Sequence, residues 1–395
     1  PDYYIELFEL PSDSLFAHQW YLLNQGQDYY GIKRIPGYEN DSLVLKSGEM
    51  NKDVRIVGQY IAPRSDTAGK VIVGVLDTGV DTDHRELVGR IWRNLDEIPG
   101  NGVDDDHNGY VDDTVGYDVS GDTSNFFDPE GDADPRDSDG HGTHIAGIVA
   151  ANADGRGVVG IAPMVQIMPV KIMPNGTTAI GAEAIVYAVN NGARVINISW
   201  GTPFQSQFLY EALDFARKNG VLVCIAAGNS GDNTRFYPAG FDLDSTLVVG
   251  AGNSRGYETY FSTYGAHIDI IAPGEDILSL RATGTDMYEP YPTAEPLVRI
   301  IDEHYYLSDG TSMAAPMVVG AAALLWSFRP DLSISELLEI MTHGATDLID
   351  PLERGDTLPG PDTLSGWGYL NIDASLALLQ NGGMYIAAPG QRTRH

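Results

Sequence analysis

Three side chains that can carry out nucleophilic or acid–base chemistry, and one amide that can donate hydrogen bonds, lie at the boundaries of predicted elements in this 395-residue sequence. Asp77 directly follows the apolar run 71–76, and His141 begins a predicted helix between two glycines. Asn229 ends another apolar run, and Ser312 lies where a turn becomes a helix. Strand ends and helix starts are where α/β proteins place ligands and catalytic groups, so the four are candidates for one site.

Each of these residues has an ordinary structural alternative. Asp77 could cap a turn or a helix, and Asn229 could be a left-handed turn residue. Ser312 could cap its own helix, where backbone N–H groups are free and the helix dipole is positive. His141 and His144 are one helical turn apart, which suits a metal pair. A zinc-protease motif also needs a Glu directly after the first His, and this sequence has a glycine there.

The strings around the four residues resemble those of the subtilisin-like serine proteases (subtilases). They are VLDTGV, DGHGTHIAG, AAGNSG and GTSMAAP, and they occur in the order found in that family. The resemblance covers about residues 62–380. It implies that Ser312 is the nucleophile, that His141 accepts its proton, that Asp77 orients the imidazole and that Asn229 donates to the oxyanion.

The same resemblance implies a substrate-binding edge and a P1 pocket next to the nucleophile. The residues concerned are Ser199, Trp200, Gly201, Ala226, Ala227, Gly228 and Phe236. The first three form the edge to which the substrate backbone adds as a strand, and Ala226 to Gly228 form one pocket wall. Phe236 falls at the floor of the pocket, where ordinary core packing is the alternative.

The elements predicted to position these residues alternate along the chain. Continuous apolar runs predict strands buried on both faces of a parallel sheet, at 71–76, 166–173, 193–200, 221–227, 246–252 and 267–273. Helical patterns occur at 142–152, 178–192, 206–220, 333–345 and 371–383. The sequence therefore predicts an α/β, subtilisin-like fold with a mostly parallel central sheet and helices on both faces.

The helix that follows Ser312 is rich in very small residues. Gly320 to Ala323 carry almost no side chain, which predicts close packing against a neighbouring element. Pro316 is placed in the first turn, where its missing N–H has no intrahelical partner to lose.

Composition excludes some classes of partner. The chain has 24 basic and 55 acidic residues and a formal net charge of −31, which argues against nucleic acid and anionic membranes. It favours bound cations or a saline setting. The single cysteine, Cys224, excludes an intramolecular disulfide and lies in an apolar run as a core residue. No apolar run approaches the length of a membrane span, and the N-terminus lacks the features of a signal peptide.

An acidic segment predicts calcium binding. Residues 96–139 contain fifteen Asp or Glu and one Arg. Five residues of this segment, three of them Asp, keep the spacing of an oxygen-ligand calcium loop: Asp104, Asp106, Asn108, Tyr110 and Asp112. Val115 stands where an EF-hand has its closing Glu, so the segment is not an EF-hand, and a solvated acidic loop is the alternative. The resemblance to subtilases implies a second calcium site at Glu86 and Asp154.

We expect three parts of the chain: a surface arm (1–62), a peptidase domain (63–383) and a C-terminal tail (384–395). The resemblance implies a secreted, extracellular, monomeric serine endopeptidase that acts on proteins or peptides, with a propeptide removed before Pro1. Asp309, Met317 and the insertion 280–306 depart from the family pattern. Two alternatives are a catalytically inactive binding protein on this fold and an acidic, calcium-dependent adhesion protein.

Overall fold

The centre of the molecule is a seven-stranded parallel sheet. The computed structural model describes residues 10–33, 42–56, 71–121, 131–285, 287, 299–348 and 359–380. The strand order is β4-β5-β3-β6-β7-β8-β9. These strands are β3 (Ile72–Asp77), β4 (Tyr117–Asp118), β5 (Gln166–Lys171), β6 (Val195–Ile198), β7 (Leu222–Ala226), β8 (Thr246–Gly252) and β9 (Ile270–Pro273). The predicted fold class is confirmed.

All six predicted strands are present, and their alternate side chains divide between two faces of the sheet. In β3, Val73 and Val75 join one core cluster while Leu76 joins the other. The apolar runs are continuous because both faces are covered. Of the seven strands of this sheet, only β4 was not predicted, since two residues are too few to give a periodic pattern.

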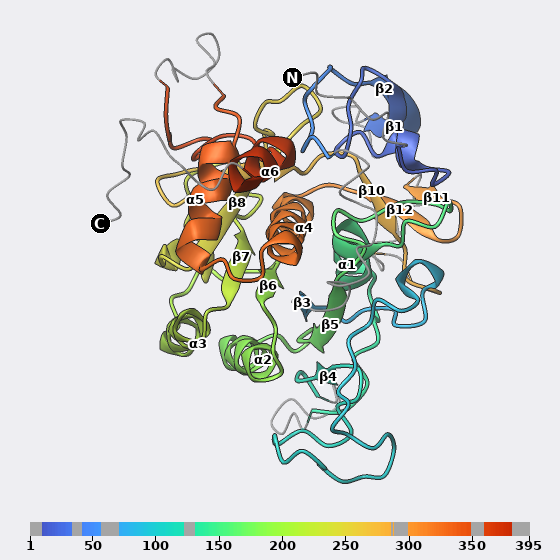
Figure 1. The fold of residues 1–395 in the computed structure, drawn as a ribbon, viewed down its shortest axis with the longest axis vertical. Coiled ribbons are helices and arrows are strands. Elements are labelled where there is room, and N and C mark those ends of the chain that lie inside the picture. The colour runs from blue at the N-terminus through green and yellow to red at the C-terminus, as the bar shows by residue number, and fades with distance from the viewer. Residues whose placement is uncertain are drawn as a thin grey trace.

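Helices cover both faces (Figure 1). On one face lie α1 (His141–Ala150), α4 (Thr311–Phe328), α5 (Ile334–Gly344) and α6 (Ile372–Gln380). On the other lie α2 (Thr178–Asn190) and α3 (Gln207–Lys218). Short 3-10 turns occur at η1 (Phe16–His18), η3 (Arg85–Leu87) and η4 (Ala239–Phe241). Each predicted helix is confirmed, although residues 381–383 lie outside the described part of the chain.

Helix α4 packs as closely as its small residues predict. A Cβ atom added to Gly320 would lie 2.8 Å from the Cβ of Ile161, so only glycine allows this approach. Of its 18 residues, 89% are buried. By length and composition alone it could cross a membrane, so the expectation that no apolar run approaches that length is wrong. Its small and apolar residues pack inside the protein core instead.

The described part of the N-terminal arm packs onto the same core. Trp20 and Tyr21 are fully buried, and the Tyr21 hydroxyl donates to the carbonyl of Leu278 (2.7 Å). The arm continues as an antiparallel hairpin, β1 (Asp28–Lys33) and β2 (Ser42–Ser47). A second antiparallel sheet has β12 (Tyr305–Ser308) between β10 (Ile277–Leu280) and β11 (Ile300–Ile301). The predicted tail 384–395 lies outside the described residues.

Cys224 lies in β7 and is fully buried. Burial raises the pKa of its thiol above the usual range, which keeps it protonated. The prediction of a core residue is confirmed.

Candidate active site

Three adjacent strands and two helices bring the predicted catalytic residues together. Strands β3, β6 and β7 are neighbours, and Asp77 and Asn229 lie at or just beyond the carboxyl ends of β3 and β7. His141 is the first residue of α1, and Ser312 is the second residue of α4. Both helices pack on the same face of the sheet. Parallel strands end at one edge, so the side chains converge there.

Asp77 and His141 form a short hydrogen bond. The Nδ1 atom of His141 lies 2.6 Å from Oδ1 of Asp77, which is 3% exposed. An ionised carboxylate can only accept, so Nδ1 carries the proton and donates it. In the neutral ring the opposite nitrogen, Nε2, is therefore the acceptor. The same Asp77 oxygen accepts the backbone N–H of Thr78 (2.8 Å), which fixes the carboxylate.

The charges around His141 favour its protonated form. Burial alone would lower the pKa of the imidazole, but the carboxylates of Asp77, Asp139 and Asp137 together raise it more. The net pKa therefore lies above the usual value of 6.5. A base with a raised pKa holds a transferred proton more firmly.

Asp137 organises the turn that leads into α1. Its carboxylate accepts the hydroxyls of Thr78 (2.9 Å) and Thr143 (2.6 Å) and the backbone N–H of Thr143 (2.9 Å). It also accepts the N–H groups of Asp139 and Gly140. Sequence reasoning did not assign this residue. An Asp shortly before a helix start is the available signal, because such residues satisfy free N–H groups.

Ser312 does not cap its helix. The N-cap is Gly310, and no side-chain capping bond is formed. The Ser312 hydroxyl instead donates to the backbone carbonyl of Ser199 (3.1 Å). A hydroxyl has one proton, so it is not available to a second acceptor while it donates to Ser199.

Pro316 lies one turn further into the helix than predicted. It is the sixth residue of α4, so its missing N–H leaves the carbonyl of Ser312 without its i+4 donor. The Ser199 hydroxyl donates to that carbonyl instead (3.0 Å). The Ser199 hydroxyl also accepts from the amide of Asn197 (2.9 Å). The proline thus creates an acceptor that ties the Ser312 segment to the end of β6.

The Asn229 amide is oriented by Thr311, the residue before Ser312. Its Oδ1 accepts the backbone N–H of Thr311 (2.9 Å) and the Thr311 hydroxyl (3.1 Å). With Oδ1 held in this way, Nδ2 is the group left to donate. A Cβ added to Gly310 would lie 3.3 Å from Nδ2, so the amide lies beside the Ser312 turn. Asn229 is not among the described residues that have a positive φ angle. It is therefore not a left-handed turn residue.

The expected substrate edge follows β6. Ser199, Trp200 and Gly201 come directly after this strand, and Gly201 is exposed. The Trp200 indole N–H donates to the carbonyl of Leu76 (3.0 Å), and its ring lies against Gly181 of α2. The side chain is therefore anchored, while the exposed Gly201 backbone borders the site.

Phe236 lies between Gly228, in the expected wall of the P1 pocket, and Gly201, in the expected substrate edge. A Cβ added to Gly228 would lie 2.6 Å from Cδ2 of the Phe236 ring, and one added to Gly201 would lie 3.3 Å from its Cβ. Its neighbour Tyr237 pairs with Thr202 through two backbone hydrogen bonds (2.7 and 2.8 Å). Phe236 is half-buried and belongs to neither core cluster. It occupies the space beside Gly228.

Residues 68–368 match the model of the family described as Peptidase_S8, Subtilase family. This chain is a subtilase. Subtilisin DY of Bacillus licheniformis is 34% identical to it over 312 residues, 77% of this chain and 90% of that protein. The cell wall-associated protease of Bacillus subtilis (strain 168) is 31% identical over 93% of this chain and 36% of its own length. These relatives establish a serine endopeptidase.

Solved structures agree with the subtilase assignment. Fervidolysin of Fervidobacterium pennivorans, a keratinolytic enzyme related to subtilisin, aligns with a TM-score of 0.61 and 28% identity. The alignment covers 82% of this chain and 44% of the fervidolysin chain. A protease from Pseudoalteromonas arctica PAMC 21717 aligns with a TM-score of 0.64 and 27% identity over 94% and 100% of the two chains.

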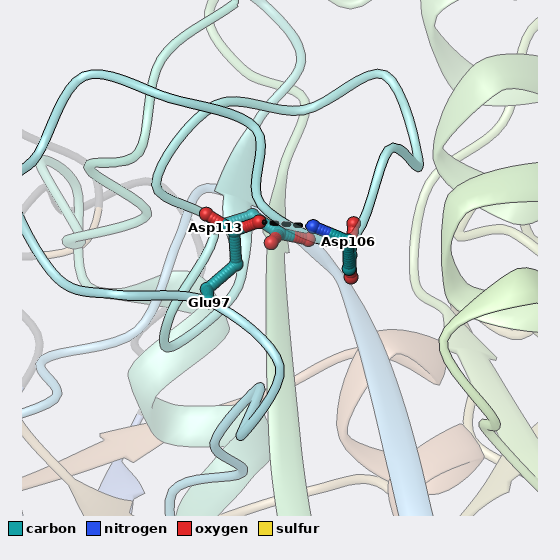
Figure 2. Close-up of side chains that lie close together, drawn as sticks. All are labelled: Glu97, Asp106 and Asp113. Atoms are coloured by element: carbon teal, nitrogen blue, oxygen red, sulfur yellow. Dashed lines mark hydrogen bonds between the residues drawn. The ribbon is translucent and has the colours of Figure 1, made fainter.

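An acidic cluster forms in the segment expected to bind calcium. In the described residues of this subtilase, Glu97, Asp106 and Asp113 place carboxylate oxygens within 4.8 Å of one another (Figure 2). Glu97 and Asp113 are buried. The Asn94 amide donates to both Asp106 (2.9 Å) and Asp113 (2.8 Å). Three clustered oxygen donors suit a hard cation.

Of the five predicted loop ligands, only Asp106 belongs to this cluster. Asp104 accepts the N–H groups of Asn108 (3.1 Å) and Gly109 (2.9 Å), and Asp112 accepts those of residues 101 and 102. The Oδ1 of Asn108 accepts the N–H of Tyr110 (2.8 Å). Glu97 and Asp113 were not predicted because Glu97 lies outside the motif and Asp113 falls one residue beyond it.

Glu86 has a buried oxygen that no described group satisfies. Its side chain is fully buried, and Oε1 accepts the hydroxyl of Tyr305 (2.7 Å). Within the described residues, Oε2 has no hydrogen-bond partner. The predicted second ligand, Asp154, forms an ion pair with Arg156 (2.5 Å), and Asp13 accepts its N–H (3.1 Å). An orphaned buried carboxylate oxygen is a fitting donor for a cation.

Proposed function

We propose that this subtilase cleaves peptide bonds through an acyl-enzyme on Ser312, with His141 as general base and Asp77 as its orienting partner. The observation that carries the proposal is the 2.6 Å bond between Asp77 and Nδ1 of His141. It leaves Nε2 as the basic nitrogen, which is the tautomer that the reaction requires.

The first step forms one bond and transfers one proton. The Ser312 oxygen attacks the scissile carbonyl as its proton passes to Nε2 of His141, and the carbonyl oxygen becomes an oxyanion. The Asn229 amide and the backbone N–H of Ser312 stabilise that oxyanion. His141 then gives the proton to the leaving amine as the C–N bond breaks. Water hydrolyses the resulting ester by the same steps.

The buried carboxylate stabilises the charge that forms on His141. Asp77 lies against the ring that becomes the imidazolium, so the proton transfer needs no new group to move. Asp139 and Asp137 add to this field, as the raised pKa of His141 indicates.

Hydrolysis of a fluorogenic peptide tests the proposal. Ser312→Ala should abolish turnover while the far-UV circular dichroism and melting temperature stay unchanged. Ser230→Ala is the matched control, because Ser230 is an exposed serine whose hydroxyl forms hydrogen bonds with Asp232 and Thr263. Substantial turnover by Ser312→Ala would refute the assigned nucleophile.

For the substrate, we propose a small P1 side chain. The Phe236 ring occupies the space beside Gly228, so a large P1 group would meet it. The backbone at Ser199 to Gly201 would pair with the substrate as an added strand, and Ala226 to Gly228 would line its side. Proteins and peptides are the proposed substrates.

Calcium is the proposed structural cofactor. One ion would be held by Glu97, Asp106 and Asp113, and the clustering of their carboxylate oxygens supports this site. A second ion would be held by Glu86 and Asp154, and the unpartnered Oε2 of Glu86 supports this one. The ion would neutralise clustered carboxylates. Asp104, Asn108, Tyr110 and Asp112 remain proposed contributors to the loop site.

Secretion, a monomeric state and a removed propeptide remain proposals for this chain. They rest on its likeness to bacterial subtilisins and on a net charge of −31, which suits a cation-rich exterior. Activity in washed culture supernatant, size-exclusion mass and the N-terminal sequence of the native protein test the three separately.

A further inference from the structure

Four charged side chains link the N-terminal hairpin to the turn that precedes Ser312. Lys46 of β2 pairs with Asp276 (2.5 Å), and Arg299 pairs with Asp309 (2.8 Å). The exposed fractions of the side chains are 1% for Asp276, 11% for Asp309 and 15% for Arg299. Two anions and two cations thus lie together at the start of β10 and the end of β12.

The hairpin contacts Asp276 through the backbone of β1 and the side chain of Lys46. The carboxylate accepts the backbone N–H of Ile32 in β1 (2.8 Å) as well as the Lys46 ammonium. The indole of Trp20 donates to its carbonyl (3.3 Å). At Gly31, an added Cβ would lie 2.7 Å from Lys46 and 2.9 Å from the Asp276 carboxylate. Glycine is therefore the residue that lets the pair form beside β1.

Asp309 fixes the end of β12 next to the nucleophile. Its Oδ1 accepts the backbone N–H of Asp276 (2.7 Å), and Oδ2 accepts the Arg299 guanidinium. These contacts continue the β10–β12 ladder, in which Ile277 pairs with Ser308. Since α4 begins at residue 311, the restraint acts within three residues of the Ser312 hydroxyl.

The Lys46 and Arg299 cations offset the repulsion between the Asp276 and Asp309 carboxylates. Burial first, and the nearby Asp309 next, raise the pKa of Asp276, while Lys46 lowers it. Without the ammonium, a buried anion would lie uncompensated beside a second anion. The resulting repulsion acts directly on the backbone at Asp309, because the N–H of Asp276 and the Asp309 carboxylate are hydrogen-bonded.

We propose that Asp309 is a positioning residue for Ser312 and that the hairpin, through Lys46 and Asp276, holds it in place. The inference rests on the proposed role of Ser312 as nucleophile. The N-terminal hairpin would then contribute to catalytic rate without touching substrate. A misplacement of about 1 Å in a catalytic group can cost about a hundredfold in rate, so a small shift of this turn is measurable.

Kinetics of four variants test the proposal, normalised to the concentration of competent sites by fluorophosphonate titration. Lys46→Met should lower kcat about tenfold and change KM less than about twofold. Adding Asp276→Asn removes the orphaned charge and keeps the acceptor for Ile32, so the double variant should recover to within about threefold of wild type. Lys33→Met, which removes an exposed lysine of the same hairpin, should have wild-type kinetics.

The variant Asp309→Asn tests the proposal independently. It keeps an acceptor for the N–H of Asp276 but loses the charge facing Arg299, and kcat should fall about fivefold. Wild-type kcat in Lys46→Met and Asp309→Asn, or a Lys46→Met defect that Asp276→Asn does not relieve, would overturn the inference. Failure of the wild-type protein to react with the fluorophosphonate would instead overturn the proposed nucleophile.

Discussion

The catalytic edge and the acidic loop of this subtilase are held in place by different forces. The catalytic edge is the set of residues proposed for catalysis (Asp77, His141, Asn229 and Ser312), which lie at the ends of β3 and β7 and the starts of α1 and α4. The acidic loop (residues 94–113) has no helix or strand and extends away from the sheet beyond β4 (Figure 1). It has seven Asp or Glu and no Lys or Arg.

The difference shows which kind of site a fold can hold by itself. Buried strands and helices fix the catalytic edge, and their apolar packing does not depend on a ligand. Carboxylate-to-backbone hydrogen bonds shape the loop, but its like charges repel one another. We therefore expect single substitutions at the catalytic edge to change the rate of catalysis. We expect cations to change the stability of the loop.

The largest expected effect is at the catalytic edge. Asn229→Ala should lower kcat about a hundred- to a thousandfold with little change in KM, because an oxyanion donor acts mainly in the transition state. Peptide hydrolysis at saturating and low substrate separates the two constants. Asn219→Ala, at the exposed end of α3, is the control. A change confined to KM would contradict the assigned oxyanion role.

Calcium removal should act on the loop and leave the catalytic edge folded. A cation bound only by the folded protein stabilises it by about 2.7 kcal/mol at a hundred times its dissociation constant. In Ser312→Ala protein, which should not digest itself, chelation should lower the melting temperature and speed hydrogen exchange in residues 94–113. Helices α1 and α4 should keep their protection at temperatures below unfolding.

Variants in the loop make this comparison sharper. Asp113→Asn should imitate chelation in part, because Asp113 belongs to the three-carboxylate cluster. Asp105→Asn, outside that cluster, should melt like the parent protein. Magnesium should restore little, since its small octahedral shell suits a many-oxygen loop poorly. Identical melts with and without chelator would mean that the loop is only a solvated acidic surface.

A smaller effect is expected at the P1 pocket. Phe236→Ala should open the space beside Gly228 and raise kcat/KM for P1 Phe over P1 Ala about tenfold. A peptide library with cleavage sites read by mass spectrometry measures the preference. Phe208→Ala, which removes an exposed phenylalanine of α3, is the control. An unchanged P1 profile would show that Phe236 is only packing.

The smallest expected effect is a shift in pH dependence. The raised pKa of His141 predicts that kcat/KM rises with pH through a value above 6.5, as the imidazole becomes a free base. Asp139→Asn removes one of the carboxylates that raise this pKa, so the acid limb should move to lower pH. Asp134→Asn, whose carboxylate pairs with Arg136 at the surface, is the control. A shift to higher pH would contradict this electrostatic account.

The same raised pKa affects stability in a defined direction. The protonated form of His141 is favoured in the folded protein, so its stabilising contribution is fully present below the unfolded-state pKa near 6.5. It is lost as the pH rises through the raised folded-state pKa.

The sequence predicted best where one physical rule decides the structure. Apolar runs such as 71–76 and 221–227 had to be buried strands, and the residues after them had to reach one sheet edge. The position of Pro316 was missed because the start of α4 depends on Gly310 and on the Ser199 hydroxyl, which lies far away in sequence.

In the acidic loop, spacing predicted the class of ligand but not the cluster. Glu97 lies outside the repeating motif, and the chain must fold back to bring it to Asp106 and Asp113. Likewise, the direction of the Phe236 ring depends on two glycines in separate loops. Contacts of this kind come from tertiary packing, which no local pattern contains.

The central claim is that Ser312 is a nucleophile activated by His141, and covalent labelling tests it most directly. Wild-type protein, His141→Ala and Ser312→Ala would be treated with a fluorophosphonate at mildly alkaline pH, digested and mapped by mass spectrometry. The account predicts one adduct, on Ser312, in the wild type, a much slower adduct at the same residue in His141→Ala, and none in Ser312→Ala. An adduct on another serine, or equal labelling of Ser312 with and without His141, would contradict it.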